Sequence, residues 1–224
     1  MFSETPWKEA RTRIVKKVIP LLIISLLLVG QAYSKPAFGL RLGLNSANAT
    51  HGPDENDYQS DSKAGLILGG AFEAAISKKG NRTIRIEAAY VQKGWQDSGE
   101  LFGVGISGKA EIDEFVITPA VIFRLSDAKT IPYILVGADV GFTMKAKATV
   151  NVGGLEATGD IPDWEGTDAG LDLGVGLLFP SGEGEFLTEL RFSIGMTDMY
   201  PGDDWDPTTN NVEFILGYNF TVPK

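Results

Sequence analysis

Apolar and polar side chains alternate along most of the chain after Phe38. The segment TELRFSIGM, residues 188–196, is typical. Its leucine, phenylalanine, isoleucine and methionine fall on one parity, and Glu189 and Arg191 fall on the other. A period of two predicts a β-strand with two unlike faces. No segment after Phe38 has a convincing helical period, so the pattern predicts an all-β chain.

Seven further segments alternate in the same way, at residues 38–47, 65–76, 82–94, 115–125, 132–145, 169–179 and 211–220. Each is about ten residues long or slightly longer, the length of a strand that crosses an outer membrane at a tilt. Pro119 lies inside one of them, although proline lacks the N–H that a central strand donates. We expect a bulge at Pro119, or a strand register that tolerates it.

The connections between these segments alternate in length. Short connections span residues 77–81, 126–130 and 180–184, and long ones span residues 47–64, 95–110, 145–168 and 198–210. Short turns at one end and long loops at the other are typical of a bacterial outer-membrane barrel. The sequence therefore predicts an eight-stranded antiparallel up-and-down transmembrane β-barrel, with lipid as its surroundings.

In such a barrel the apolar parity faces lipid and the polar parity faces the lumen. The polar parity carries glycine, which leaves room for long side chains, and its cations are mainly arginine, which pairs well with carboxylates in confined spaces. Because eight strands enclose an interior that side chains just fill, a wide pore is disfavoured, and ion or proton conduction is the minor alternative. We expect a structural network of lumen ion pairs from Arg41, Glu73, Arg85, Glu87, Arg124, Asp139, Asp172, Glu189, Arg191 and Glu213.

Aromatic rings lie near the ends of the alternating segments or in the adjacent connections. Rings at these levels suit the aromatic belts at the two surfaces of a bilayer. We expect such belts to include Tyr90, Trp95, Trp164, Tyr200, Trp205 and Tyr218.

The first 34 residues have the three parts of a secretory signal peptide. A basic stretch, KEARTRIVKK, precedes the apolar run VIPLLIISLLLVG, and small residues follow near Ser34. The alternative, a membrane-anchoring helix, needs roughly 20 apolar residues, and this run has about 13. We expect a signal peptide over residues 1–34, cleaved after Ser34, and a barrel domain over residues 35–224.

The 224-residue chain has a formal net charge of −9, no cysteine and one histidine, His51. The lack of cysteine excludes disulfides and cysteine metal sites, and the acidity disfavours nucleic acid as a partner. No cofactor is implied. Clustered carboxylates in the long connections could bind Ca²⁺ or Mg²⁺, but they lack EF-hand spacing, so solvated loops are favoured. These carboxylates are Asp54, Glu55, Asp57, Asp61, Asp203, Asp204 and Asp206.

Five stretches resemble the outer-membrane β-barrel family that includes the PorT-like proteins: GLRLGLNSA, IRIEAAYVQKG, FVITPAVIFR, PYILVGADVG and TELRFSIGM. The resemblance covers nearly all of residues 38–222. It implies the barrel fold and the outer-membrane location, and for some relatives a link to protein secretion. Such barrels often end on an aromatic residue, whereas Phe220 is followed here by TVPK.

We therefore expect a non-enzymatic protein of the bacterial outer membrane with a structural or interaction role, in contact with lipid and with other envelope proteins. A secreted soluble ligand-binding β-barrel is the first alternative, since lipocalin-like chains also have eight strands. A lipid-modifying enzyme is the second, because His51 lies near Ser46 and Asp54 in the sequence. Proximity in sequence does not define a catalytic triad, so the enzyme is disfavoured.

Overall fold

Nine β-strands make up the part of the chain that the computed structural model describes, residues 36–50, 59–101, 104–161, 166–196 and 208–221. Within these residues, no helix has the length and hydrophobicity needed to cross a membrane. The strands are β1 (Ala37–Thr50), β2 (Gln59–Ala75), β3 (Arg82–Leu101), β4 (Val104–Arg124), β5 (Ile131–Val152), β6 (Leu155–Asp160), β7 (Thr167–Ser181), β8 (Gly184–Gly195) and β9 (Thr208–Thr221).

Eight of these strands form a closed antiparallel ring. Strands β1 to β5 pair in chain order, β5 pairs with β7, and β7, β8 and β9 pair in turn. The pairing of β9 with β1 closes the ring, so no ring strand has an open edge within the barrel. The predicted eight-stranded up-and-down barrel is confirmed. Strand β6 lies outside the ring and pairs with β5.

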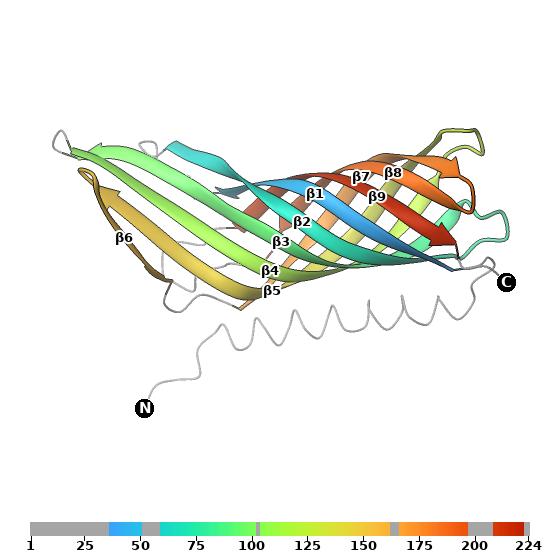
Figure 1. Ribbon diagram of the computed structural model, residues 1–224, viewed down its shortest axis with the longest axis horizontal. Coiled ribbons are helices and arrows are strands. Elements are labelled where there is room, and N and C mark those ends of the chain that lie inside the picture. Colours follow the sequence, from blue (N-terminus) through green and yellow to red (C-terminus); the bar gives the residue numbers. More distant parts are fainter. Residues whose placement is uncertain (1–35, 51–58, 102–103, 162–165, 197–207, 222–224) are drawn as a thin grey trace, which may run out of the picture.

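Strands β3, β4 and β5 continue past the ring at one end, where the start of β2 pairs with β3 and β6 pairs with β5 (Figure 1). We call this part the outer sheet and define it as the segments of β3, β4, β5 and β6 within residues 95–112 and 145–160. The expectation of long loops at residues 95–110 and 145–168 is therefore wrong, because most of these residues are paired strand. Outside a bilayer neither face of a strand must be uniformly apolar, so the alternation that marks the barrel strands weakens there.

The outward-facing side chains change character where the outer sheet begins. On β4 and β5, Phe115 pairs with Phe142, whereas the next outward pair toward the outer end is Asp113 with Lys145. A β-bulge shifts the register between Asp113 and Glu114 at this level. Since a charged side chain is costly against hydrocarbon, the bilayer boundary on these strands lies between the phenylalanine pair and the charged pair.

Strand β8, which contains the segment TELRFSIGM, shows which of its two faces is exposed and which is buried. Phe192 and Ile194 are 47% and 50% exposed, whereas Glu189 and Arg191 are 1% and 4% exposed. Strands β1 and β9 repeat this arrangement, with exposed leucine or phenylalanine on one parity and buried polar residues on the other. The apolar face therefore surrounds the barrel and the charged face fills it, as predicted.

Pro119 lies in β4 without a bulge. The β4–β5 ladder is open at Thr118 and Pro119, and it resumes at Ala120 and Gly137 in the register that it has at Ile117 and Val140. Of the two predictions for this position, the tolerant register is confirmed and the bulge is wrong. The open step costs little because proline has no N–H to leave unpaired.

An aromatic group lies on the lipid-facing side near the short-turn end. The ring of Tyr218 contacts those of Phe186 and Phe220 edge to face, with centroids 4.6 and 4.7 Å apart. Tyr90 is half-buried, and its hydroxyl accepts a hydrogen bond from Gln92. Trp164, Tyr200 and Trp205 lie outside the described residues.

Candidate functional site

Six buried charged side chains meet inside the lumen. They come from β1, β2, β3 and β8, and because β3 and β8 are not neighbours in the ring, the group ties opposite walls together. We call it the arginine cluster: Arg41, Glu73, Arg85, Glu87, Glu189 and Arg191.

Arg85 is the hub of the arginine cluster. Its Nε donates to Glu73 Oε1 at 2.7 Å, and its Nη1 donates to Glu189 Oε2 at 2.7 Å. Arg191 Nη2 donates to Glu189 Oε1 at 2.6 Å and to Glu87 Oε1 at 3.1 Å. Three cations thus face three carboxylates, so the cluster is balanced in charge.

Tyr133 supports the cluster from β5. Its hydroxyl donates to Glu189 Oε2 at 2.6 Å, and the Arg85 guanidinium lies 5.7 Å from the centre of its ring. A Cβ at Gly176 would collide with the Tyr133 ring, and a Cβ at Gly141 would collide with the Glu114 carboxylate. Glycine on the lumen side therefore leaves room for large side chains, as the sequence suggested.

Apolar side chains also face the lumen, and the sequence reading missed them. They belong to one cluster that includes Ile67, Val91, Val116, Ile122, Leu135, Leu178, Leu187 and Ile215. Nearer the outer end, Trp95 packs with Ala110 and Ile112. The placement of Trp95 in an interfacial belt is therefore wrong, because it lies on the lumen-facing parity of β3.

The lumen holds a second charged group between the arginine cluster and Trp95. We call it the carboxyl chamber and define it as Lys93, Glu114, Asp139, Asp168, Asp172 and Glu213, all buried. Lys93 Nζ lies 2.8 Å from Glu114 Oε2 and 3.0 Å from Asp168 Oδ2. Arg191 of the neighbouring cluster lies 3.6 Å from Glu213 Oε2.

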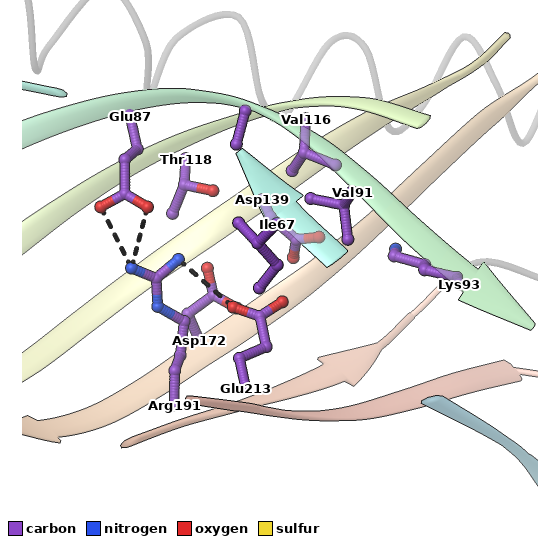
Figure 2. A pocket seen from close by; sticks show the side chains of 11 residues that line it. Ile67, Glu87, Val91, Lys93, Val116, Thr118, Asp139, Asp172, Arg191 and Glu213 are labelled. Atoms are coloured by element: carbon purple, nitrogen blue, oxygen red, sulfur yellow. Dashed lines mark hydrogen bonds and ion pairs between the residues drawn. The ribbon is translucent and has the colours of Figure 1, made fainter. Parts of the chain in front are cut away.

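Most of these carboxylates line a very small cavity. Figure 2 shows Arg191 between Glu87 and Glu213, whereas Asp139 and Asp172 line the same space without an ion pair to the residues drawn. The cavity volume is only about 10 Å³, which is room for about one water molecule. This cavity is therefore too small to hold a solute larger than water.

The lumen opens at the short-turn end into a vestibule of about 400 Å³. Glu73 of the arginine cluster is one of its lining residues. On its wall, Arg124 Nη2 lies 2.7 Å from Glu185 Oε1, and both side chains are partly exposed. The arginine cluster therefore separates this vestibule from the carboxyl chamber.

Nine of the ten residues that the sequence assigned to the lumen are buried there, and Arg124 lies half-buried at the vestibule. The structure brings six of them together as the arginine cluster and places Asp139, Asp172 and Glu213 in the carboxyl chamber. The lumen residues predicted from the sequence did not include Lys93, Glu114 and Asp168. Glu114 and Asp168 lie just before the predicted strand starts, and extending the parity by one residue would have found them.

Glu111 lies on the outward face of the outer sheet, beyond the bilayer boundary. Its Oε1 lies 2.8 Å from Lys109 Nζ and 3.1 Å from Lys63 Nζ. Hydrogen bonds from Lys109 and Lys63 and the charge of Lys63 lower the pKa of Glu111 to about 2. The carboxylate is therefore ionised at neutral pH, and this face of the outer sheet is charged.

A closed ring with an apolar outer face and a charged, filled lumen defines an integral β-barrel protein of the bacterial outer membrane. The chain belongs to the family described as "Outer membrane protein beta-barrel domain", which matches residues 31–200. The lipid bilayer is thus its surroundings, and the alternative of a secreted soluble barrel is wrong.

Solved structures of outer-membrane barrels are similar to the chain. The outer membrane protein OprG from Pseudomonas aeruginosa is 13% identical, with a TM-score of 0.51 over 87% of this chain and 99% of that one. Ail of Yersinia pestis is 16% identical, with a TM-score of 0.41 over 84% and 100%. Neisserial surface protein A is 14% identical, with a TM-score of 0.44 over 83% and 99%. At these identities the likeness concerns the fold alone, and no curated protein matches the chain.

The described residues contain no group of three or more histidine, cysteine or acidic side chains arranged to hold a metal ion. Asp61 is described and exposed, whereas His51 and the remaining acidic-loop residues of the metal hypothesis lie outside the described part. The predictions for the acidic loops and for His51 therefore stay predictions.

Proposed function

We propose that the protein is an interaction protein of the outer membrane, in which the barrel is the anchor and the outer sheet binds a partner polypeptide. The filled lumen supports this role over that of a diffusion pore. The observation that carries the proposal is an exposed apolar face on the outer sheet, next to the outer edge of β6.

This apolar face extends to the tip of the outer sheet. Leu155 is 81% exposed, and Val104, Val150 and Val152 are 41%, 46% and 44% exposed. They share one face, because Val152 pairs with both Leu155 and Ile106, and Ile106 has the same parity as Val104. An exposed apolar patch rimmed by polar residues is typical of a protein interaction site.

Strand β6 adds backbone groups to this surface. In the described part of the chain it pairs with β5 alone, so its other edge presents N–H and C=O groups to which an extended segment can add. β6 is short and carries Glu156 and Asp160, and short charged edges limit unspecific pairing. These features favour a partner segment with apolar and basic residues.

The resemblance to PorT-like proteins supports protein secretion as the process in which this partner acts. We accordingly propose another envelope protein as the partner and no enzymatic activity for the chain. The signal peptide over residues 1–34 and the barrel domain over residues 35–224 remain part of this proposal.

Photo-crosslinking in native membranes tests the proposed surface. A photoreactive amino acid at Leu155 is expected to give a discrete adduct with one envelope protein. The same group at Lys129, in a short turn at the opposite end of the barrel, is expected to give none. Adducts from Lys129 alone, or from neither position, would contradict the proposal.

A matched variant separates loss of the surface from loss of the fold. Val152→Thr combined with Leu155→Ser removes apolar area from the tip but leaves the ring intact. We expect the crosslink from a photoreactive group at Ala157 to weaken several-fold, while the folded barrel keeps its faster migration on unheated gels. An undiminished crosslink would show that the apolar face is not the binding surface.

A further inference from the structure

The buried charges of the lumen are unbalanced, and the imbalance lies in one place. The described barrel buries eight carboxylates and four cations. The arginine cluster accounts for three of each. The carboxyl chamber therefore holds five carboxylates, Glu114, Asp139, Asp168, Asp172 and Glu213, and its own single cation, Lys93.

Three carboxylates of the chamber have buried oxygen atoms without a hydrogen-bond partner. One of them, Glu114, has Lys93 Nζ 2.8 Å from its Oε2, which leaves Asp139 and Asp172. Asp139 Oδ1 and Asp172 Oδ2 are buried and have no hydrogen-bond partner, and both residues line the cavity shown in Figure 2. Asp139 is 5% and Asp172 is 2% exposed. Asn211 Oδ1, from β9, is a further buried acceptor without a partner. An unpaired acceptor in a buried site is costly, so these atoms call for a donor.

The neighbours of Asp139 and Asp172 leave these two oxygen atoms without a donor, although the Ser193 hydroxyl hydrogen-bonds Asp172. Lys93 on β3 is occupied by Glu114 on β4 and Asp168 on β7. The lining of the cavity adds Glu87 from β3, Arg191 from β8, Glu213 from β9, and two uncharged residues, Ile67 from β2 and Thr118 from β4. Arg191 is shared by Glu87, Glu189 and Glu213. On β1, Asn45 pairs with Glu213 of β9 and is neutral.

A buried carboxylate without a cation becomes neutral by binding a proton more readily than it stays charged. The cavity holds about one water molecule, and the described residues offer no cluster suited to a metal ion. We propose that the carboxyl chamber is a proton-binding site in which Asp139 and Asp172 hold protons at neutral pH.

Proton binding here predicts how stability depends on pH. An aspartate of the unfolded chain loses its proton near pH 4, about 3.9. Above that pH the folded barrel holds more protons than the unfolded chain, so stability falls as the pH rises. For each proton that the folded chamber retains, the unfolding equilibrium constant rises about tenfold with each pH unit. This rise ends at the pH at which the folded chamber itself loses that proton.

Infrared spectroscopy of the barrel in lipid tests the proposal, first on the wild type and then on variants. A protonated carboxyl has a C=O stretch distinct from that of a carboxylate. We expect this band at pH 7, and we expect it to decrease in Asp139→Asn combined with Asp172→Asn. Asp127→Asn, in an exposed short turn, is the matched control and should leave the band unchanged. Absence of the band at pH 7 would overturn the proposal.

Urea unfolding at several pH values gives a second readout. In the wild type, each proton site should make the unfolding equilibrium constant rise by a further factor of about ten per pH unit. The double variant lacks both sites and should lose both factors. The single variant Asp172→Asn should remove about half of that effect and serves if the double variant fails to fold. Equal pH slopes in wild type and variants would contradict the proposal. Stabilisation of the wild type alone by added Na⁺ or Mg²⁺, without a protonated-carboxyl band, would assign the site to a metal ion instead.

Discussion

Arg85→Met is expected to lower the free energy of unfolding by about 3–5 kcal/mol, the largest effect of any single substitution that we consider. Arg85 donates to Glu73 on β2 and to Glu189 on β8, so it joins two walls of the ring. Methionine keeps most of the side-chain volume but leaves these carboxylates facing one another with fewer cations. Urea unfolding of the refolded barrel in detergent or lipid measures the loss.

Two variants make the Arg85 result specific. Arg85→Met combined with Glu73→Gln restores equal numbers of cations and carboxylates, so it should recover part of the lost stability. Arg124→Met breaks the partly exposed pair with Glu185 at the vestibule, where water screens the charges, and should cost no more than about 1 kcal/mol. A loss below about 1 kcal/mol for Arg85→Met would show that the arginine cluster does not hold the barrel together.

Phe192→Arg is expected to have the second largest effect, a loss of about 2–4 kcal/mol, because arginine is most costly at the middle of the bilayer. Phe192 lies on the lipid-facing side of β8 between Leu173 and Val212, near the centre of the apolar run of that strand. Folding into lipid vesicles, followed by urea unfolding, measures the change.

The control for Phe192→Arg uses the same substitution at a different depth. Met196→Arg lies near the outer end of the apolar run and should cost about 0–1 kcal/mol. Phe192→Ser removes the ring without adding charge and should be milder than Phe192→Arg. Equal effects of arginine at the two depths would contradict the placement of the bilayer around β8.

The parity of each barrel strand could be predicted from the sequence because a slip of one residue exchanges the two faces. Leu40 and Arg41, or Glu189 and Leu190, can therefore be assigned to opposite sides without any knowledge of the ring. The strand count and the closed topology followed from eight such segments with alternating short and long connections. Of the ten charged residues that the same reasoning assigned to the lumen, nine are buried inside the barrel and Arg124 is half-buried at the vestibule.

Contacts across the lumen could not be predicted in this way. Arg85 and Glu189 are 104 residues apart in the sequence, and their contact depends on the tilt and stagger of all the strands between them. Lys93 was not among the predicted lumen residues, yet it lies buried in the lumen between Glu114 and Asp168. The outer sheet was missed because strands in water need no continuous apolar face.

The depth of fluorescent labels tests most directly whether the apolar face of the barrel lies in lipid. The chain has no native cysteine, so single cysteines can be introduced and labelled. Single cysteines at Phe192, Leu216 and Glu156 can each carry a fluorophore in reconstituted vesicles. Brominated lipid chains should quench the labels at positions 192 and 216, whereas a water-soluble quencher should reach the label at position 156 in the outer sheet. Labels at positions 192 and 216 that escape the brominated lipid but respond to the water-soluble quencher would contradict a barrel whose apolar face lies against lipid.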